Sequence, residues 1–181
     1  AREEGIILNC ILCLEPQVEG FLDLGVTSLA NGYLSEEQLN DEEPSYPLKV
    51  GFCNNCRHVQ LMDKVSPKEM FTDYLYVSSA SDTLRNHLIG LSDLVVSRLG
   101  LSGNDLVIDI GCNDGTLLGG FRGHGLRVLG VDPAENLALL SQESGIDRFV
   151  GFFGDHTADE IGETWGEASV ITATNTFPHI P

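Results

Sequence analysis

Two Cys-x-x-Cys segments, Cys10 to Cys13 and Cys53 to Cys56, constrain this 181-residue chain more than any other feature. Each segment can present two thiolates to one side of a metal ion, and four thiolates complete the tetrahedral shell that zinc prefers. A shell closed by four protein ligands leaves no open position for a substrate, so the metal would be structural. The sequence therefore predicts one Zn²⁺ bound by Cys10, Cys13, Cys53 and Cys56.

Two other interpretations of these cysteines are a redox-active pair and free thiols. A redox pair of the thioredoxin type begins a helix after a strand, and Cys10 precedes any such unit. The five cysteines include Cys112 and form an odd number in a chain without an export signal, which disfavours a disulfide framework. The 39 residues between the pairs exceed the roughly 15 to 20 of a compact zinc ribbon, so the metal would join two distant segments. His58 could replace one cysteine, although a surface histidine is the simpler interpretation.

Charge and hydropathy argue against two classes of partner, nucleic acids and membranes. Aspartate and glutamate number 27 against 10 lysine and arginine, and the net charge of −17 opposes binding to nucleic acid phosphates. No apolar run reaches the roughly 20 residues that span a bilayer, so we expect no membrane association. The N-terminus lacks the basic and then apolar layout of a secretion signal, and we therefore expect a soluble, cytoplasmic protein.

Short apolar runs alternate with helical patterns after residue 103. Strands are predicted at 106–110, 127–131, 148–152 and 168–173, and helices at 115–122, 134–144 and 158–163. This alternation is typical of an α/β fold with a doubly wound parallel sheet. Earlier segments predict a strand at 46–52, an acidic loop at 36–43, a helix beginning at Pro67 and a helix over 82–99 that ends at Gly100. We expect a zinc-binding domain over 1–64, a helical connector over 65–103 and a partial nucleotide-binding domain over 104–181.

A glycine-containing loop follows the first strand of this predicted sheet. Gly111 and Gly115 lie where the strand turns into a helix, so the backbone there could approach a ligand closely. An acid ends the next strand, and it could accept hydrogen bonds from both hydroxyls of a ribose. An ordinary strand-to-helix turn is the structural alternative. The predicted nucleoside-binding residues of these two segments are Asp109, Gly111, Cys112, Asn113, Gly115, Asp132 and Pro133.

Two features of this loop favour S-adenosylmethionine (SAM) over NAD as the ligand. The loop reads Asp-x-Gly-x-x-x-Gly, which differs from the Gly-x-Gly-x-x-Gly of dinucleotide sites. Asp114 would repel a pyrophosphate, whereas SAM carries a sulfonium and an ammonium and no phosphate. Phe153 and Asp155 follow the third strand, where they could stack on adenine and accept from its amine. Asn175 and His179 follow the fourth strand, at the edge of the sheet where ligands of such folds bind.

Several motifs along the chain together resemble one family. They are Cys10-x-x-Cys13, Leu24-Gly-Val-Thr-Ser-Leu-Ala-Asn31, Tyr46-Pro-Leu48, Cys53-x-x-Cys56, Val59-Gln-Leu61, Tyr74-x-Tyr76-x-Ser78-Ser79-x-Ser81 and Ile110-Gly-Cys-Asn-Asp-Gly115. In this order they resemble the zinc-containing sugar C-methyltransferases. These are Rossmann-like class I enzymes that use SAM to methylate carbon 3 of nucleotide-linked 4-keto deoxysugars in antibiotic pathways. The resemblance covers nearly all of the chain.

The resemblance implies a nucleotide-sugar substrate and places Tyr74, Tyr76 and His179 near it as catalytic groups. The chain departs from the family pattern at Ser28, Arg57, Cys112 and Pro178, none of which is a predicted metal ligand. Members of the family continue through further strands, a Glu-His pair and a C-terminal domain. We therefore expect this chain to be an N-terminal portion, a fragment, or one completed by another protein chain.

Two hypotheses of function follow from the sequence. The first is the SAM-dependent sugar C-methyltransferase, and the second is a zinc- and SAM-binding module or scaffold without catalytic activity. A NAD-dependent oxidoreductase is a more distant third, because the dinucleotide fingerprint is missing.

Overall fold

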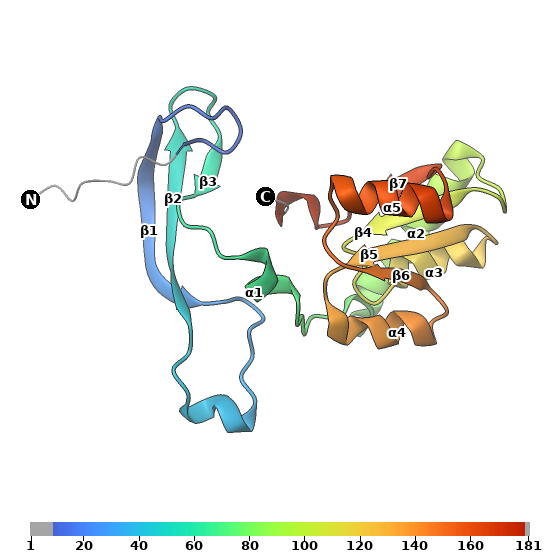
Figure 1. Cartoon of the computed structure of the whole chain (residues 1–181), viewed down its shortest axis with the longest axis horizontal. Coiled ribbons are helices and arrows are strands. Elements are labelled where there is room, and N and C mark those ends of the chain that lie inside the picture. Colours follow the sequence, from blue (N-terminus) through green and yellow to red (C-terminus); the bar gives the residue numbers. More distant parts are fainter. Residues whose placement is uncertain (1–8, 180–181) are drawn as a thin grey trace, which may run out of the picture. The chain divides into compact units, whose positions relative to one another are not determined.

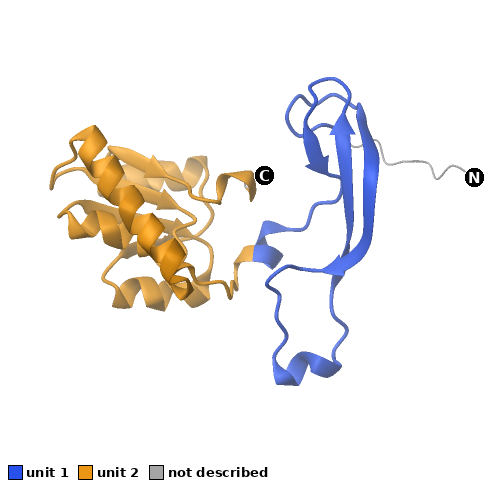
Figure 2. Ribbon diagram, turned by 180° about the vertical axis from the view of Figure 1, so that it is seen from behind, with its two compact units in different colours: residues 1–70 blue, residues 71–181 orange. Residues whose placement is uncertain are grey.

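The computed structural model describes residues 9–179, and its chain divides after Met70 into two compact units, residues 1–70 and 71–181 (Figure 2). The three-part division predicted at residues 64 and 103 stays a prediction. Within the described residues, no helix is both long and apolar enough to cross a membrane.

The first unit is built on a three-stranded antiparallel sheet in the order β1-β2-β3 (Figure 1). Its strands are β1 (Val18–Ser28), β2 (Ser45–Cys53) and β3 (Val59–Leu61). A short 3-10 helix, η1 (Glu36–Asn40), lies in the exposed connection between β1 and β2, where the sequence predicted a loop. The helix α1 (Pro67–Phe71) follows β3 and begins at the predicted proline.

Strand β2 agrees with the prediction, whereas β1 and β3 were missed. No residue of β1 is buried, so this strand does not have the buried face from which alternating strands are predicted. Its pairing with β2 is also interrupted by register shifts between Gly20 and Leu22 and between Asp23 and Val26. Tertiary pairing with β2 therefore decides this strand, and its own residues do not.

The second unit contains a four-stranded parallel sheet in the order β6-β5-β4-β7 (Figure 1). In chain order, this is the third, second, first and fourth strand, which confirms the doubly wound arrangement. The strands are β4 (Leu106–Ile110), β5 (Arg127–Asp132), β6 (Asp147–Val150) and β7 (Val170–Thr172). The α-helices are α2 (Asp82–Leu99), α3 (Thr116–Gly123), α4 (Ala138–Glu143) and α5 (Asp155–Trp165). The 3-10 helices are η2 (Ser78–Ala80), η3 (Glu135–Leu137) and η4 (Phe177–His179).

Apolar side chains cover both faces of this sheet, which is why its central strands read as continuous hydrophobic runs. On one face, Val107 and Val128 pack with residues of α2 and α3, including Leu88 and Phe121. On the other face, Leu106 and Leu129 belong to a cluster with Ile161 of α5. The sheet is thus enclosed by helices on both sides, and its strand ends are left to form a site.

Helix boundaries follow local signals in the sequence. The hydroxyl of Ser81 accepts a hydrogen bond from the Leu84 amide at the start of α2, and Gly100 ends that helix with a φ of 65°. The predicted helix over 134–144 divides into η3 and α4, and α5 begins three residues earlier than expected. These are differences of boundary and not of element type.

Helices α2 and α3 approach closely at Gly120, and this contact yields a testable prediction. A Cβ added at Gly120 would lie 3.0 Å from Cβ of the buried Ser92, whereas one added at Gly119 meets nothing within 4 Å. We expect Gly120→Ala to lower the free energy of unfolding by about 1–3 kcal/mol through overpacking. Gly119→Ala is the matched control and should raise it by up to about 1 kcal/mol through helix propensity. Urea unfolding of the two variants measures both effects, and equal effects would contradict the packing argument.

Candidate functional site

The four cysteines of the two Cys-x-x-Cys segments converge in the first unit, and their Sγ atoms all lie within 4.8 Å of one another. Sγ of Cys10 is 3.5 Å from Sγ of Cys56, and Sγ of Cys13 is 3.7 Å from Sγ of Cys53. Zinc–sulfur bonds of about 2.3 Å in a tetrahedron separate the sulfurs by about 3.8 Å. All four thiols are free of disulfides. The donor set and its spacing therefore fit one tetrahedral Zn²⁺.

Hydrogen bonds to the cluster change how readily its thiols ionise. The amide of Asn55 donates to Sγ of Cys13, and this bond, with one from a backbone N–H at Glu15, lowers the pKa of Cys13 to about 6. A backbone N–H at His58 acts in the same direction on Cys56, yet burial and the neighbouring sulfurs raise the pKa of Cys56 to about 12. Four sulfurs at these distances can all ionise only if a cation balances their charge, so the shell suits a metal.

Gln60 of β3 holds the two cysteine segments together and was not singled out from the sequence. Its side chain is only 5% exposed. Oε1 of Gln60 accepts from the Ile11 amide at 2.9 Å, and its Nε2 donates to the Asn9 carbonyl at 3.4 Å. One amide side chain thus fixes the first segment against the strand that follows the second segment.

In the second unit, the sheet order reverses beside β4, between β5 on one side and β7 on the other. Ligands of open α/β sheets bind outside the carboxyl ends of the strands at such a point. Asp109 lies in β4 there with 2% exposure, and its Oδ1 accepts from the hydroxyl of Thr172 at 2.6 Å. Burial raises the pKa of Asp109 to about 7, Thr172 opposes the shift, and the charge of Asp132 adds to it. Near neutral pH, Asp109 is therefore present in both its neutral and its ionised form.

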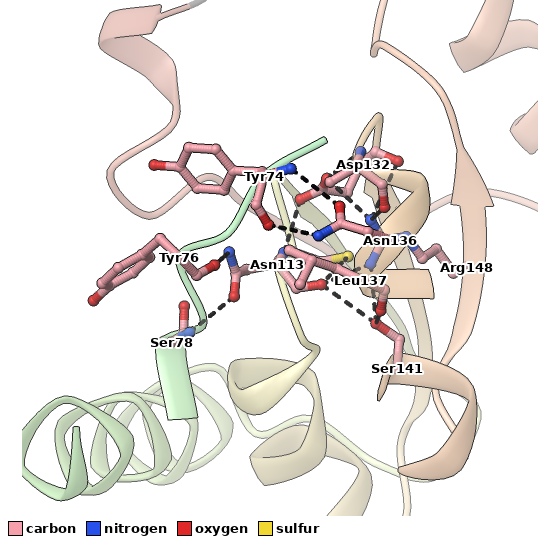
Figure 3. A network of polar contacts seen from close by, with 11 residues as sticks. Tyr74, Tyr76, Ser78, Asn113, Asp132, Asn136, Leu137, Ser141 and Arg148 are labelled. Atoms are coloured by element: carbon pink, nitrogen blue, oxygen red, sulfur yellow. Dashed lines mark hydrogen bonds and ion pairs between the residues drawn. The ribbon is translucent and has the colours of Figure 1, made fainter. Parts of the chain in front are cut away.

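Asp132 ends β5, and both of its carboxylate oxygens already have partners in the protein (Figure 3). Oδ2 accepts from the Asn113 amide at 2.8 Å. Oδ1 accepts from the Ala134 amide at 2.9 Å and lies 3.0 Å from the guanidinium of Arg148. Two carboxylate oxygens offer about four acceptor positions, so these three contacts leave room for about one further donor. The site can thus take one ribose hydroxyl here, where the sequence suggested two.

Arg148 of β6 was not singled out from the sequence, yet it joins the loops that follow β4 and β5. Its side chain is 4% exposed. The guanidinium donates to the carbonyls of Asn113 and Ala134, each at 2.7 Å, and to the hydroxyl of Ser141 at 3.0 Å. Its Nε has no hydrogen-bond partner among the described residues. The sequence did offer one signal for this role, a single arginine at the start of a predicted strand whose other residues are uncharged.

The glycine loop is shaped by contacts within the protein. Gly111 has a φ of 71°, and a Cβ there would lie within 3 Å of the Thr176 side chain, so the glycine admits the segment after β7. Gly115 caps the start of α3 with a φ of 82°. The side chain of Cys112 is buried in the core, where burial raises its pKa, so only its backbone could meet a ligand. The ligand contacts predicted for these three residues stay predictions.

Asp114 lies just before the cap of α3 and is only 6% exposed. Its carboxylate accepts from the Ser79 amide at 2.8 Å and from both the amide and the hydroxyl of Thr116. Burial disfavours the charge, but these hydrogen bonds outweigh it and hold the pKa of Asp114 below its usual value. The negative charge of Asp114 is therefore stabilised by groups of the protein itself.

The tyrosine segment lies against the loops that follow β4 and β5 (Figure 3). The Tyr74 amide donates to Oδ1 of Asn136 at 3.0 Å, and Nδ2 of Asn136 donates back to the Tyr74 carbonyl at 2.9 Å. Nδ2 of Asn113 donates to the Tyr76 carbonyl at 2.9 Å. The structure thus brings the two predicted catalytic tyrosines to the same loops as the predicted cofactor residues.

Aromatic rings connect this segment with the end of the described chain. The ring centroids of Tyr74 and Tyr76 are 6.4 Å apart, and Phe71 lies 5.9 Å from Tyr74 and 6.1 Å from His179. Tyr76 is 44% exposed, so its ring is open to a ligand. The three residues assigned to catalysis therefore form one cluster, with Phe71 between Tyr74 and His179.

The remaining predicted residues follow the ends of β5, β6 and β7. Pro133 is half-buried beside Asp132, and Asp155 is the exposed first residue of α5. Asn175 is exposed in the turn after β7, with a φ of 56°. Phe153 packs against the core on the α5 side, whereas its neighbour Phe152 is 39% exposed. The stacking role given to Phe153 stays a prediction.

Comparison with known proteins agrees with a zinc-binding first unit. Residues 10–71 match the family model Methyltransf_13, described as "Putative zinc binding domain". The matched range begins at the first cysteine of the cluster and includes all four of them.

The chain is 34% identical over 173 residues to the C-methyltransferase NovU of Streptomyces niveus, a match that covers 96% of this chain and 41% of NovU. It is 32% identical over 74 residues to an uncharacterized methyltransferase of Schizosaccharomyces pombe, which covers 40% of this chain and 28% of that protein. The chain thus spans about two-fifths or less of the length of these relatives.

Among solved structures, coclaurine N-methyltransferase bound to N-methylheliamine and SAH is 20% identical, with a TM-score of 0.33 over 45% of this chain and 25% of that one. The two sequence relatives and the family model together support a relation to methyltransferases and a zinc-binding role for the four cysteines.

Proposed function

We propose that this chain is the zinc- and SAM-binding part of a C-methyltransferase that acts on a nucleotide-linked 4-keto deoxysugar. The observation that carries the proposal is the pair of acids, Asp109 and Asp132, at the carboxyl ends of the adjacent parallel strands β4 and β5. Such a pair suits a ligand that carries a ribose and positive charge, and it disfavours a pyrophosphate. The identity with NovU supports the reaction class, and the family resemblance suggests the sugar.

In this proposal, SAM supplies an electrophilic methyl group. Asp132 accepts from a ribose hydroxyl, and Asp109 faces the positive charge of the ligand. The carbon beside the ketone would have to lose its proton to a base to become a nucleophile for this methyl group. The hydroxyls of Tyr74 and Tyr76 and the ring of His179 are the groups that could donate to the enolate oxygen.

Methyl transfer itself provides the first test. The chain is incubated with SAM carrying a labelled methyl group and with a nucleotide 4-keto sugar, and the sugar is analysed for the label. Label on the sugar carbon beside the ketone supports the proposal. SAM binding by calorimetry without transfer would reject catalysis by this chain and leave a zinc- and SAM-binding module.

Zinc content gives a second prediction. Within residues 9–70, the only buried residues are Cys10, Gly51, Cys53 and Gln60, so this unit has almost no apolar core of its own. We expect one zinc per chain in reduced, freshly purified protein, and we expect chelation to unfold β1–β3 while the parallel sheet persists. Elemental analysis and circular dichroism measure these two effects. Cys53→Ser should lose the metal, and the matched control Cys112→Ala should retain it; equal zinc in both variants would contradict the assignment.

The ribose contact gives a third prediction. Asp132→Ala removes the carboxylate and should weaken SAM binding by at least about tenfold, the size of a hydrogen bond to a charged group. The control is Asp147→Ala, because Asp147 is an exposed acid at the start of β6, at the opposite edge of the sheet. Calorimetry measures the affinities, and thermal unfolding identifies any loss of fold. Unchanged affinity in Asp132→Ala would mean that the nucleoside binds elsewhere.

The raised pKa of Asp109 gives a fourth prediction. With a pKa of about 7 in the free protein, Asp109 is mostly neutral at pH 6 and mostly ionised at pH 8. A positive ligand prefers the ionised form, so SAM affinity should rise several-fold from pH 6 to pH 8, and binding near pH 7 should release protons. Asp109→Asn keeps the size of the side chain and should remove most of this pH dependence. A profile that is the same in both proteins would exclude Asp109 as its source.

A further inference from the structure

The backbone of residues 72–78 is bound by the loops after β4 and β5 through every second residue. The Thr72 carbonyl accepts from the Glu135 amide at 3.1 Å, and Tyr74 uses both its amide and its carbonyl on Asn136. Further along, the Tyr76 carbonyl accepts from Asn113 at 2.9 Å. We call residues 72–78 the tyrosine strap.

Two asparagine side chains make most of these contacts. A carboxamide carries one acceptor and one donor group, so it can replace a peptide of a neighbouring strand. Asn136 uses both groups on Tyr74. Asn113 accepts from the Ser78 amide at 2.8 Å and donates to Tyr76. Neither a carboxylate, which only accepts, nor a hydroxyl of shorter reach provides this double contact.

This alternation explains the Tyr-x-Tyr spacing. Tyr74 and Tyr76 are two residues apart, and their rings point to the same side of this stretch (Figure 3). Asn136 and Asn113 bind the backbone of Tyr74 and of Tyr76. The two tyrosine rings lie side by side, with centroids 6.4 Å apart (Figure 3). The position of both rings therefore depends on the two asparagines.

The asparagines belong to the segments that hold the nucleoside-binding acid. The backbone N–H of Asn113 donates to Asp132 at 2.8 Å, and its carbonyl accepts from Arg148. Asn136 lies four residues after Asp132, in η3. A shift of either loop is thus passed to the strap through the hydrogen bonds of one asparagine side chain.

We propose that Asn136 and Asn113 are positioning residues. They bind the backbone of the tyrosine strap, so the positions of Tyr74 and Tyr76 follow the conformation of the loops after β4 and β5. The inference rests on the proposed function for the identity of the ligand. The hydrogen bonds from the two asparagines to the strap do not depend on it. Because coupling between two sites is reciprocal, a ligand that orders the loops also orders the strap.

The test uses residue-specific amide exchange on the zinc-loaded chain, free and with S-adenosylhomocysteine. Asn136→Asp preserves size but turns the donor that faces the Tyr74 carbonyl into an acceptor, and Asn136→Ala removes both contacts. The matched control is Asn104→Asp, because Asn104 is exposed in the loop before β4 and makes the same change of charge. Thermal unfolding establishes that each variant is folded.

We expect S-adenosylhomocysteine to slow exchange of the Tyr74 and Ser78 amides in the wild-type chain and in Asn104→Asp. In Asn136→Ala, the Tyr74 amide should exchange about tenfold faster, as expected for loss of a hydrogen-bonded pair. In Asn136→Asp, the carboxylate can still accept from the Tyr74 amide but repels the Tyr74 carbonyl, so the ligand should still bind by calorimetry but should slow the Tyr74 amide less than in the wild-type chain. A purely structural role for Asn136 would not separate ligand binding from strap protection in this way.

Two results would overturn the inference while leaving the proposed function intact. The first is binding of S-adenosylhomocysteine to the wild-type chain without any change at Tyr74 or Ser78. The second is Tyr74 exchange in Asn136→Ala equal to that of the wild type. If the ligand does not bind the wild-type chain at all, the proposed function fails, and exchange in the free proteins still decides whether Asn136 holds the strap.

Discussion

The buried contact between Asp132 and Arg148 organises the carboxyl edge of the parallel sheet. Both side chains are at most 10% exposed, and the guanidinium reaches the loop after β4 and the loop after β5 from its position in β6. Removing one partner of a buried ion pair typically costs about 3–5 kcal/mol, because the other charge is left uncompensated. The same carboxylate is the predicted ribose acceptor, so the geometry of the binding site and the stability of the strand ends depend on one group.

The glycine loop after β4 is fixed by contacts within the protein. Close approach of a ligand is the usual reason for glycines at such a turn, but Gly111 admits the side chain of Thr176 from the segment after β7. Asp114, which could have faced a ligand, is bound by Ser79 and Thr116. The loop is thus fixed by the protein on two sides, and the ligand would meet a surface whose shape is set in advance.

The first unit follows a different principle of stability. Its sheet has exposed residues along nearly all of β1, and few of its described side chains are buried. A small domain without a core needs a disulfide or a metal, and the four thiols are free and suitably spaced for zinc. The 39 residues between the cysteine pairs can therefore be largely exposed, since the fold of this unit is closed by the metal ligands and by Gln60.

The sequence by itself determined the elements whose signals are local. The two Cys-x-x-Cys segments predicted the metal cluster, and the apolar runs at 106–110 and 127–131 predicted the central strands, because burial on both faces leaves a continuous pattern. Ser81 and Gly100 marked the ends of α2 through capping. Only the tertiary structure decided β1, whose residues carry no buried pattern, and the roles of Arg148, Asn136 and Gln60. Each of these polar side chains acts on backbone or side-chain groups far away in the chain, and a hydrogen bond across such a separation leaves no periodic trace in the sequence.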